Sequence, residues 1–199
     1  MSINPQSFNQ RVLDIVGRKH TVKDIVDKLF LAKQYGFIVN MDFIAGLPTE
    51  TFAEFKHSID TAIMLNPDNI TVHTLALKKG SELKQSNISA ADDGAVSDMV
   101  DYSYQKLTSN GYEPYYLYRQ KYMADNLENI GYSKNGTSSK YNIDIMEETT
   151  SILACGSNAI TKKVFISENR IERAAAPKDL PTYINKINDL IKNKKQLFI

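Results

Sequence analysis

Four positions in the first quarter of the chain carry groups that could hold one polar ligand: Gln6, Arg18, Asp42 and Gly46. A carboxylate accepts hydrogen bonds, whereas a side-chain amide donates and accepts, so an aspartate and a glutamine can share neighbouring hydroxyl groups. A guanidinium group holds a carboxylate through two parallel hydrogen bonds. A glycine lets the backbone approach a ligand closely. This set of groups suits a ligand that carries both hydroxyl groups and a carboxylate.

Each of these residues also has a purely structural interpretation. Asp42 could bond to backbone groups like a helix cap or a loop carboxylate, and Gln6 could be a turn amide after Pro5. Arg18 could be an exposed arginine at a helix start, and Gly46 could serve only the turn. The residue types alone leave both interpretations open.

The segment that carries Asp42 has the pattern of a buried parallel strand. An apolar run over 37–44 contains this single carboxylate, and Gly46 and Pro48 stop it. A second run over 70–77 predicts the next strand, with a helix between them, so the pair forms a right-handed βαβ unit. Ligands bind at the carboxyl ends of such strands. The predicted fold class is therefore α/β.

Helical periodicity fills the spaces around these strands. It predicts a short helix over 9–16, a second helix after the cap Thr21, and a third from Thr51 to Leu65. Thr51 and Glu54 have the spacing of a capping box.

The sequence becomes more polar after the second strand, which places a domain boundary near residues 80–90. The patterns beyond it predict a helix over 91–110, a tyrosine-rich strand over 112–118, a loop over 132–141, a hairpin of 164–166 with 169–173, and a helix over 181–192. For 146–154 the periodicity does not decide between helix and strand. The tyrosines could pack on a small sheet or flank a flat ligand. His73 could face the ligand end or bond within the core.

The composition gives little electrostatic drive toward nucleic acid or an anionic membrane, because 24 basic and 23 acidic side chains nearly balance. No apolar run approaches the ~20 residues of a membrane span. Met1 leads directly into a strand-like pattern, without the regions of a secretion signal. We therefore expect a cytoplasmic protein without nucleic-acid or membrane partners.

A single cysteine, Cys155, excludes an internal disulfide and any site built from several thiolates of this chain. As a lone cysteine it could be a reactive thiol, but the pattern favours a small buried apolar residue.

Several longer motifs resemble one known family. Met41-Asp-Phe-Ile-Ala-Gly-Leu-Pro48 is similar to the fifth-strand motif of the oxygen-independent coproporphyrinogen III oxidase family of radical S-adenosylmethionine enzymes, and in particular of its HemZ-type branch. Further resemblance lies in segments 1–8, 17–21, 70–77, 115–121, 126–132 and 141–148. The resemblance runs nearly from end to end.

This resemblance implies a fold and a set of ligands. Residues 1–80 would be the C-terminal strands and helices of a partial TIM-like (β/α) barrel, and residues 81–199 a small α+β C-terminal domain. Gln6 and Asp42 are expected near the ribose of S-adenosylmethionine, Arg18 near its methionine carboxylate, and Gly46 near the adenine. The family's 4Fe-4S cluster needs three closely spaced cysteines, which this chain lacks, so we expect the chain alone to be inactive.

For the full-length protein the resemblance implies a porphyrinogen substrate, whose propionate side chains are oxidatively decarboxylated to vinyl groups. Two alternatives stay open: a heme-binding or heme-trafficking relative, and a non-catalytic binding or assembly module. A barrel that starts at its fourth strand would leave an unpaired sheet edge, so we also expect this chain to self-associate.

Overall fold

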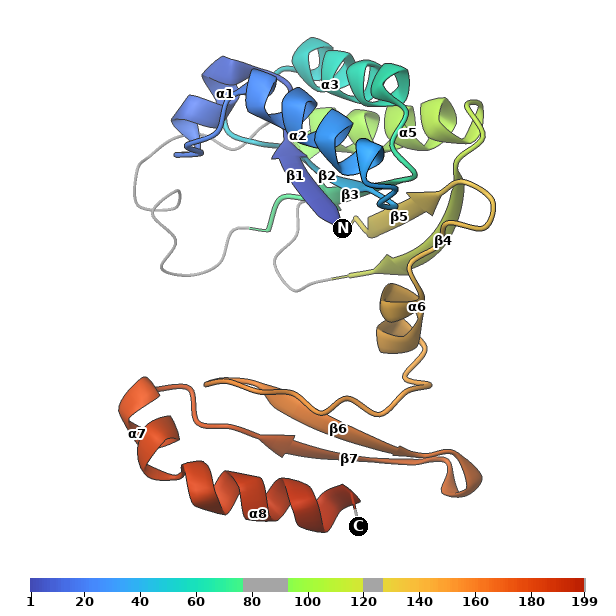
Figure 1. Cartoon of the computed structure of the whole chain (residues 1–199). Helices are drawn as coiled ribbons and strands as arrows, with labels where there is room; N and C mark the ends of the chain where they lie inside the picture. The colour runs from blue at the N-terminus through green and yellow to red at the C-terminus, as the bar shows by residue number, and fades with distance from the viewer. Residues whose placement is uncertain (77–92, 120–126, 199) are drawn as a thin grey trace. The chain divides into compact units, whose positions relative to one another are not determined.

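The computed structural model describes residues 1–76, 93–119 and 127–198. The chain forms two compact units, Met1–Ser139 and Lys140–Ile199. The elements of the first unit, in chain order, are β1 (Ser2–Gln6), α1 (Gln10–Ile15), α2 (Val22–Gln34), β2 (Asn40–Ala45), α3 (Phe52–Leu65), β3 (Asn69–Thr74), α5 (Asp93–Thr108), β4 (Glu113–Tyr118) and β5 (Asn129–Ser133) (Figure 1). The α/β alternation predicted for the start of the chain is confirmed.

One five-stranded sheet carries the first unit, in the order β1-β2-β3-β5-β4. The first three strands are parallel, whereas β5 pairs antiparallel with both β3 and β4. Strand β5 includes residues 132 and 133 of the loop that the sequence predicts over 132–141, whereas residues 134–139 are in neither a helix nor a strand. Its Gly131 hides the strand pattern, because glycine disfavours strands unless a neighbour approaches closely.

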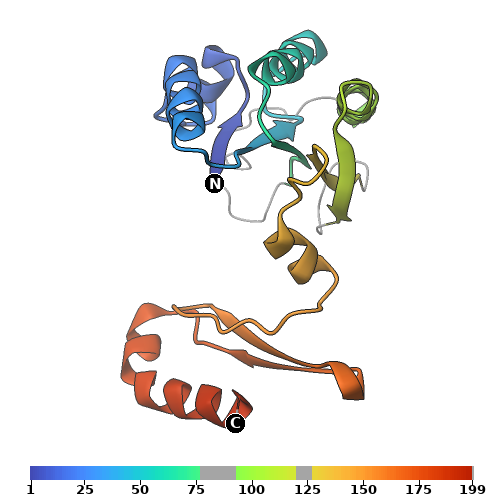
Figure 2. The same cartoon turned by 45° about the vertical axis from the view of Figure 1, so that its right-hand side comes forward.

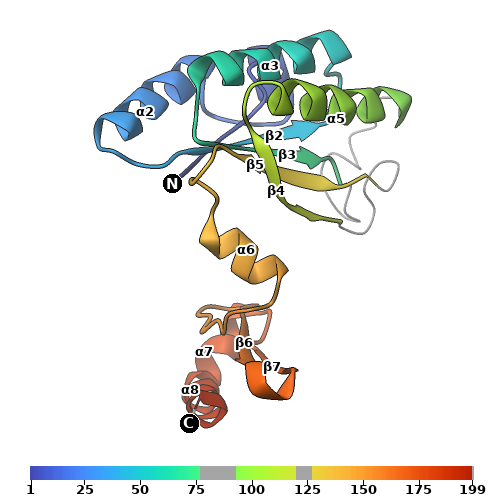
Figure 3. The same ribbon diagram turned by 90° about the vertical axis from the view of Figure 1, so that its right-hand side faces the viewer.

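The helices cover one face of this sheet. Figure 3 shows α2, α3 and α5 together on that face. Along β2 the side chains alternate, so Met41, Phe43 and Ala45 are buried and join the core with Phe55 and Ile59 of α3. The alternate residues of β2 therefore lie on the opposite face.

Local signals fix the helix starts. Capping boxes are present at Thr21 with Asp24 and at Thr51 with Glu54, so the predicted capping box of α3 is confirmed. Strand β2 starts later than predicted, because Phe37 still donates its backbone N–H to the carbonyl of Ala32 and so belongs to the closing turn of α2.

The second unit is a hairpin with helices. Its elements are α6 (Lys140–Met146), β6 (Ile160–Phe165), a 3-10 turn (Ile166–Glu168), β7 (Arg170–Ala175), α7 (Leu180–Asn185) and α8 (Ile187–Phe198) (Figure 2). The predicted hairpin is confirmed. The predicted final helix is two helices, because α7 ends at Asn185 with Lys186 as its C-cap, and α8 begins at Ile187.

Two sequence predictions need correction or stay untested. Residues 147–154 form neither a helix nor a strand, apart from a single bridge between Ile152 and Lys162. The predicted domain boundary at residues 80–90 lies outside the described residues, and its assignment stays a prediction. The compact unit continues to Ser139, because β4 and β5 extend the sheet that the first strands begin. Within the described residues, no helix combines the length and apolar character that a membrane crossing requires.

Candidate functional site

A polar cluster occupies the sheet face opposite the helices. Asn40 and Asp42 of β2 alternate with the buried residues of that strand, and Asp42 lies beside Thr71 of β3 in the parallel register. His73 lies two residues further along β3, on the same face as Thr71. Two neighbouring strands thus bring a carboxylate, an amide, a hydroxyl and an imidazole to one surface.

Asp42 has polar partners on both sides. Asn40 donates from Nδ2 to Asp42 Oδ1 at 2.7 Å, and His73 Nε2 lies 3.8 Å from the same oxygen. Burial raises the pKa of Asp42, but the contacts with His73 and Asn40 outweigh it and the pKa is lowered from its ordinary value. The side chain is 18% exposed. Asp42 is therefore an ionised acceptor at neutral pH that a ligand can still reach.

Tyrosines of β4 border this cluster. The Tyr116 hydroxyl lies 3.4 Å from Thr71 Oγ1, and the Tyr118 hydroxyl lies 3.5 Å from His73 Nδ1. The Tyr116 ring covers Gly131 so closely that an added Cβ there would lie 1.9 Å from Cε1 of the ring. Burial raises the pKa of Tyr116 to about 12, so its hydroxyl stays protonated. Of the two sequence interpretations of the tyrosines, packing on a sheet is confirmed for Tyr116, whose ring lies over Gly131 of β5.

Gln6 ends β1 next to the strand of Asp42. It pairs with Phe43 after a register shift in β1, and its φ of 69° is in the left-handed region. The residue is 6% exposed, and its Oε1 has no hydrogen-bond partner within the described part of the chain. A buried acceptor without a partner costs free energy, so this amide is suited to accept a hydrogen bond from a ligand.

Arg18 lies in the turn that follows α1, where its backbone N–H donates to the carbonyl of Leu13. It lines a groove of about 700 Å³ together with Ile3, Asn4 and His20. Among the described residues no hydrogen bond or ion pair joins Arg18 to Gln6 or Asp42. The structure thus brings Gln6 and Asp42 to adjacent strands, and it places Arg18 at a groove beside the same strand β1.

Gly46 follows β2 and has a φ of +86°. An added Cβ would lie 3.0 Å from Val96 Cγ2 of α5, so packing as well as backbone conformation requires a glycine here. Packing and backbone conformation therefore explain the glycine at position 46 without a ligand.

Sequence reasoning missed a buried carboxyl group that contacts Ser7, the residue after Gln6. Glu50 is 4% exposed, and Ser7 donates from Oγ to its Oε1 at 2.6 Å. Burial raises the pKa of Glu50 to about 7. The one sequence signal is its position just before the helix cap Thr51, where an apolar residue is common.

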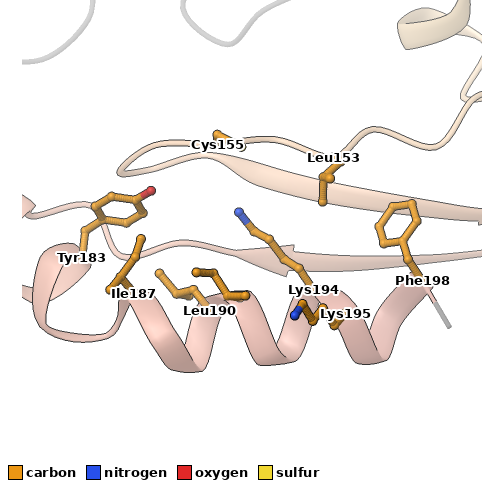
Figure 4. Close-up of a pocket in the computed structure, with 9 residues that line it drawn as sticks. Leu153, Cys155, Tyr183, Ile187, Leu190, Lys194, Lys195 and Phe198 are labelled. Atoms are coloured by element: carbon orange, nitrogen blue, oxygen red, sulfur yellow. The ribbon is translucent and has the colours of Figure 1, made fainter.

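A second cavity, of about 510 Å³, lies in the C-terminal unit between α7, α8 and the segment that carries Leu153 and Cys155 (Figure 4). Its lining is mostly apolar, and Lys194 and Lys195 are the charged members of it. Cys155 also lines this groove and is exposed, so the expectation that it is buried is wrong. None of the four predicted ligand-binding residues lies in this cavity.

A family model matches the part of the chain that carries Gln6, Arg18 and Asp42. The model of the Radical SAM superfamily covers residues 1–62. Over 205 residues the chain is 40% identical to the oxygen-independent coproporphyrinogen-III oxidase-like protein HemZ of Bacillus subtilis, with 100% of this chain and 41% of that protein covered. The chain belongs to the radical SAM superfamily. Within it, the chain is similar over its whole length to an oxygen-independent coproporphyrinogen-III oxidase-like protein, as the motifs predict.

Other proteins that are similar to this radical SAM chain bear names different from that of HemZ. The heme chaperone HemW of Haemophilus influenzae is 29% identical over 72% of this chain and 35% of its own length. The solved structure of coproporphyrinogen III oxidase HemN from Escherichia coli superposes with a TM-score of 0.69 at 20% identity, over 94% of this chain and 43% of that one. This likeness confirms the predicted fold. The chain spans less than half the length of these relatives.

The radical SAM superfamily implies S-adenosylmethionine and a 4Fe-4S cluster for the family in general. The unpartnered Oε1 of Gln6 and the ionised Asp42 fit the hydroxyl groups of a ribose. The residues of this chain do not fit a 4Fe-4S cluster, because such a cluster is held by several thiolates and the sequence has one cysteine. Nor do three histidine, cysteine or acidic side chains gather into a metal site in the described ranges.

Proposed function

We propose that this chain supplies part of the S-adenosylmethionine site of an oxygen-independent coproporphyrinogen III oxidase-like protein. In this proposal Asp42 and Gln6 bind the ribose hydroxyls, Arg18 binds the methionine carboxylate, and the backbone at Gly46 lies near the adenine. The exposed Arg18 has a long side chain that can reach a ligand from its groove beside β1.

The observation that carries this proposal is the pair of acceptors on adjacent strands. Gln6 offers a buried Oε1 without a partner, and Asp42 offers a carboxylate that stays ionised. Two acceptors on adjacent strands suit a ligand with neighbouring hydroxyl donors, as a ribose has. The carboxyl edge of a parallel sheet is also where α/β proteins bind their ligands.

In the full-length protein we propose the oxidative decarboxylation of porphyrinogen propionates to vinyl groups. S-adenosylmethionine, once bound with a reduced cluster, supplies the radical chemistry that removes a hydrogen atom from the substrate. The residues of this chain bind and orient. Asp42 keeps a fixed negative charge, and His73 and Asn40 hold its carboxylate in place. With one cysteine, the 199-residue chain alone is proposed to be inactive.

A second candidate function is heme binding or heme trafficking, because several relatives of the chain bear the name heme chaperone HemW. A purely non-catalytic binding or assembly role is the third. Titration with hemin and an assay for vinyl products separate the three. Hemin binding without product favours heme handling, product favours the decarboxylase, and neither result favours the assembly role.

The partners and the location are proposals as well. We propose a cytoplasmic protein that acts on a porphyrinogen, without nucleic-acid or membrane partners. Self-association of this chain is supported by β1, which lies at the edge of the five-stranded sheet.

The test is a calorimetric titration of the full-length protein with S-adenosylhomocysteine, which resembles the cofactor but cannot react as it does. Asp42→Asn keeps the shape and loses a charge-assisted acceptor, so binding should weaken by about 1–3 kcal/mol. Ser103→Ala is the control, because Ser103 is a buried serine whose hydroxyl donates to the Met99 carbonyl within α5. Equal binding by the wild type and Asp42→Asn would assign Asp42 a structural role.

A further inference from the structure

Two chain corners meet at the carboxyl edge of the sheet. The β1–α1 corner comprises residues 6–11, and the β2–α3 corner comprises residues 46–54. Both corners follow strands that carry a proposed cofactor ligand, Gln6 in β1 and Asp42 in β2. The contacts between the corners therefore constrain the chain next to Gln6, the last residue of β1.

A buried hydrogen-bond network joins the first corner to α3. Ser7 donates from Oγ to Glu50 Oε1 at 2.6 Å, and its Oγ also lies 3.3 Å from Ser58 Oγ. The Phe8 backbone N–H donates to Ser58 Oγ at 2.9 Å, and the Asn9 backbone N–H donates to Ser7 Oγ at 3.0 Å. Ser7 and Ser58 are fully buried. In a dry environment such bonds are strong, and losing one partner is costly.

An outer set of contacts surrounds this network. Glu54 accepts from Asn9 Nδ2 at 2.7 Å, and Arg11 holds both oxygens of Glu54 at 2.8 and 2.9 Å. Arg11 also donates to Thr49 Oγ1 at 2.8 Å. These outer groups are more exposed than Glu50, so water screens them. The buried network carries most of the constraint.

Gln6 needs such a constraint. Its φ of 69° is uncommon for a residue with a Cβ, and a residue in that region persists only where its surroundings fix it. The next residue in the chain is Ser7, whose hydroxyl donates a hydrogen bond to the carboxyl group of Glu50. The carboxyl group of Glu50 is thus one hydrogen bond and one peptide link away from Gln6.

We propose that Glu50 is a positioning residue, which acts through Ser7 to hold Gln6 in the left-handed conformation that presents its amide at the sheet edge. Glu50 itself does not touch the ligand in this account. The role of Gln6 as a ribose ligand rests on the proposed function above, whereas the fixed conformation of the corner does not.

The first experiment needs no ligand. Amide hydrogen exchange is measured at Phe8 and Asn9 in the wild-type chain and in Glu50→Ala, Glu50→Gln, Ser7→Ala and Ser103→Ala. Glu50→Ala leaves the hydrogen-bond acceptors of both amides in place. Faster exchange at these amides would therefore show that the corner is held less firmly without the Glu50 carboxyl group. We expect an increase of about tenfold or more. Glu50→Gln keeps an acceptor for Ser7 and should stay near the wild type, as should the control Ser103→Ala.

Unchanged exchange at both amides in Glu50→Ala would overturn the proposal. If Glu50→Ala does not fold, Ser7→Ala replaces it, with Phe8 as the reporter, because that amide bonds to Ser58. Exchange that rises equally across the whole chain would also overturn the proposal, since it would mean a general loss of stability.

The second experiment measures the affinity of the full-length protein for S-adenosylhomocysteine. Glu50→Ala should weaken binding about tenfold, Glu50→Gln should restore it, and the effect should vanish when Gln6→Ala is already present. An undiminished Glu50→Ala effect in the Gln6→Ala background would contradict action through Gln6. If the wild type binds nothing, the proposed cofactor site fails, while the exchange result still decides whether Glu50 positions the corner.

Discussion

The imidazole of His73 lies beside the carboxylate of Asp42, with Nε2 of His73 3.8 Å from Oδ1 of Asp42. The two residues come from neighbouring parallel strands, and Tyr118 reaches the other ring nitrogen of His73 at 3.5 Å. The carboxylate of Asp42, the proposed ribose acceptor, is therefore contacted by His73, which in turn contacts Tyr118. These side chains set the orientation and the protonation of the carboxylate.

We predict that His73→Phe raises the pKa of Asp42 toward its ordinary value. The contact with His73 helps to keep this pKa low against the effect of burial, so its loss should favour the protonated form. Carboxyl chemical shifts followed through an acid titration measure the change. His57→Phe, on the exposed side of α3, is the control. An Asp42 titration that is the same in both variants would mean that His73 does not influence the carboxylate.

A second prediction concerns pH and Glu50. Its pKa is about 7 in the folded protein, against 4.5 for an ordinary glutamate, so between these values the folded state binds more protons than the unfolded state. The stability from this group is fully present below pH 4.5 and is lost as the pH rises through 7. The loss is on the order of 3 kcal/mol.

Urea unfolding of the wild type and Glu50→Gln across this pH range checks this prediction. Glu54 and Arg11 lie near Glu50 in both proteins, so their own titration largely cancels in the comparison. The free energy of unfolding of Glu50→Gln, relative to the wild type, should rise with pH. A difference that does not change with pH would show that Glu50 titrates alike in the folded and unfolded states.

Gly131→Ala should destabilise the sheet by about 1–3 kcal/mol, because the new Cβ collides with a packed ring. That Cβ would lie 1.9 Å from Cε1 of Tyr116. Thermal or urea unfolding gives the size of the effect. In a Tyr116→Ala background the same change should cost much less. Equal costs in the two backgrounds would mean that Tyr116 does not restrict position 131.

The 199-residue chain should self-associate through the edge strand β1. Light scattering over a range of dilutions measures the mass. Asn4→Lys places a charge on the exposed part of β1 and should lower the association, whereas Asn110→Lys, in the exposed turn after α5, should not. A monomer at every concentration would contradict this prediction.

Local patterns predicted the first half of the fold well. Apolar runs, the glycine stops and the Thr51–Glu54 spacing are short-range signals, and they correctly indicated β2, β3 and their helices. Strand β5 could not be found in this way, because Gly131 is acceptable only where the Tyr116 ring packs over it. That contact joins residues far apart in the sequence.

In the candidate site, too, short-range signals were predicted and contacts between distant residues were not. Residue type and strand position suggested Gln6 and Asp42, but their surroundings depend on pairing between strands. The contact of Asp42 with His73 requires the parallel register, and the bond of Ser7 to Glu50 requires two corners to meet. No spacing in a single sequence encodes either contact. The position of Arg18 in its own groove was equally hidden from the sequence.

A structure of the full-length protein with bound S-adenosylmethionine tests the central claim most directly. The account predicts that the ribose hydroxyls lie within about 3 Å of the Asp42 carboxylate and of Gln6 Oε1. It also predicts that the Arg18 guanidinium group contacts the methionine carboxylate. A ribose bound elsewhere, with the polar face of β2 and β3 empty of cofactor, would contradict the account.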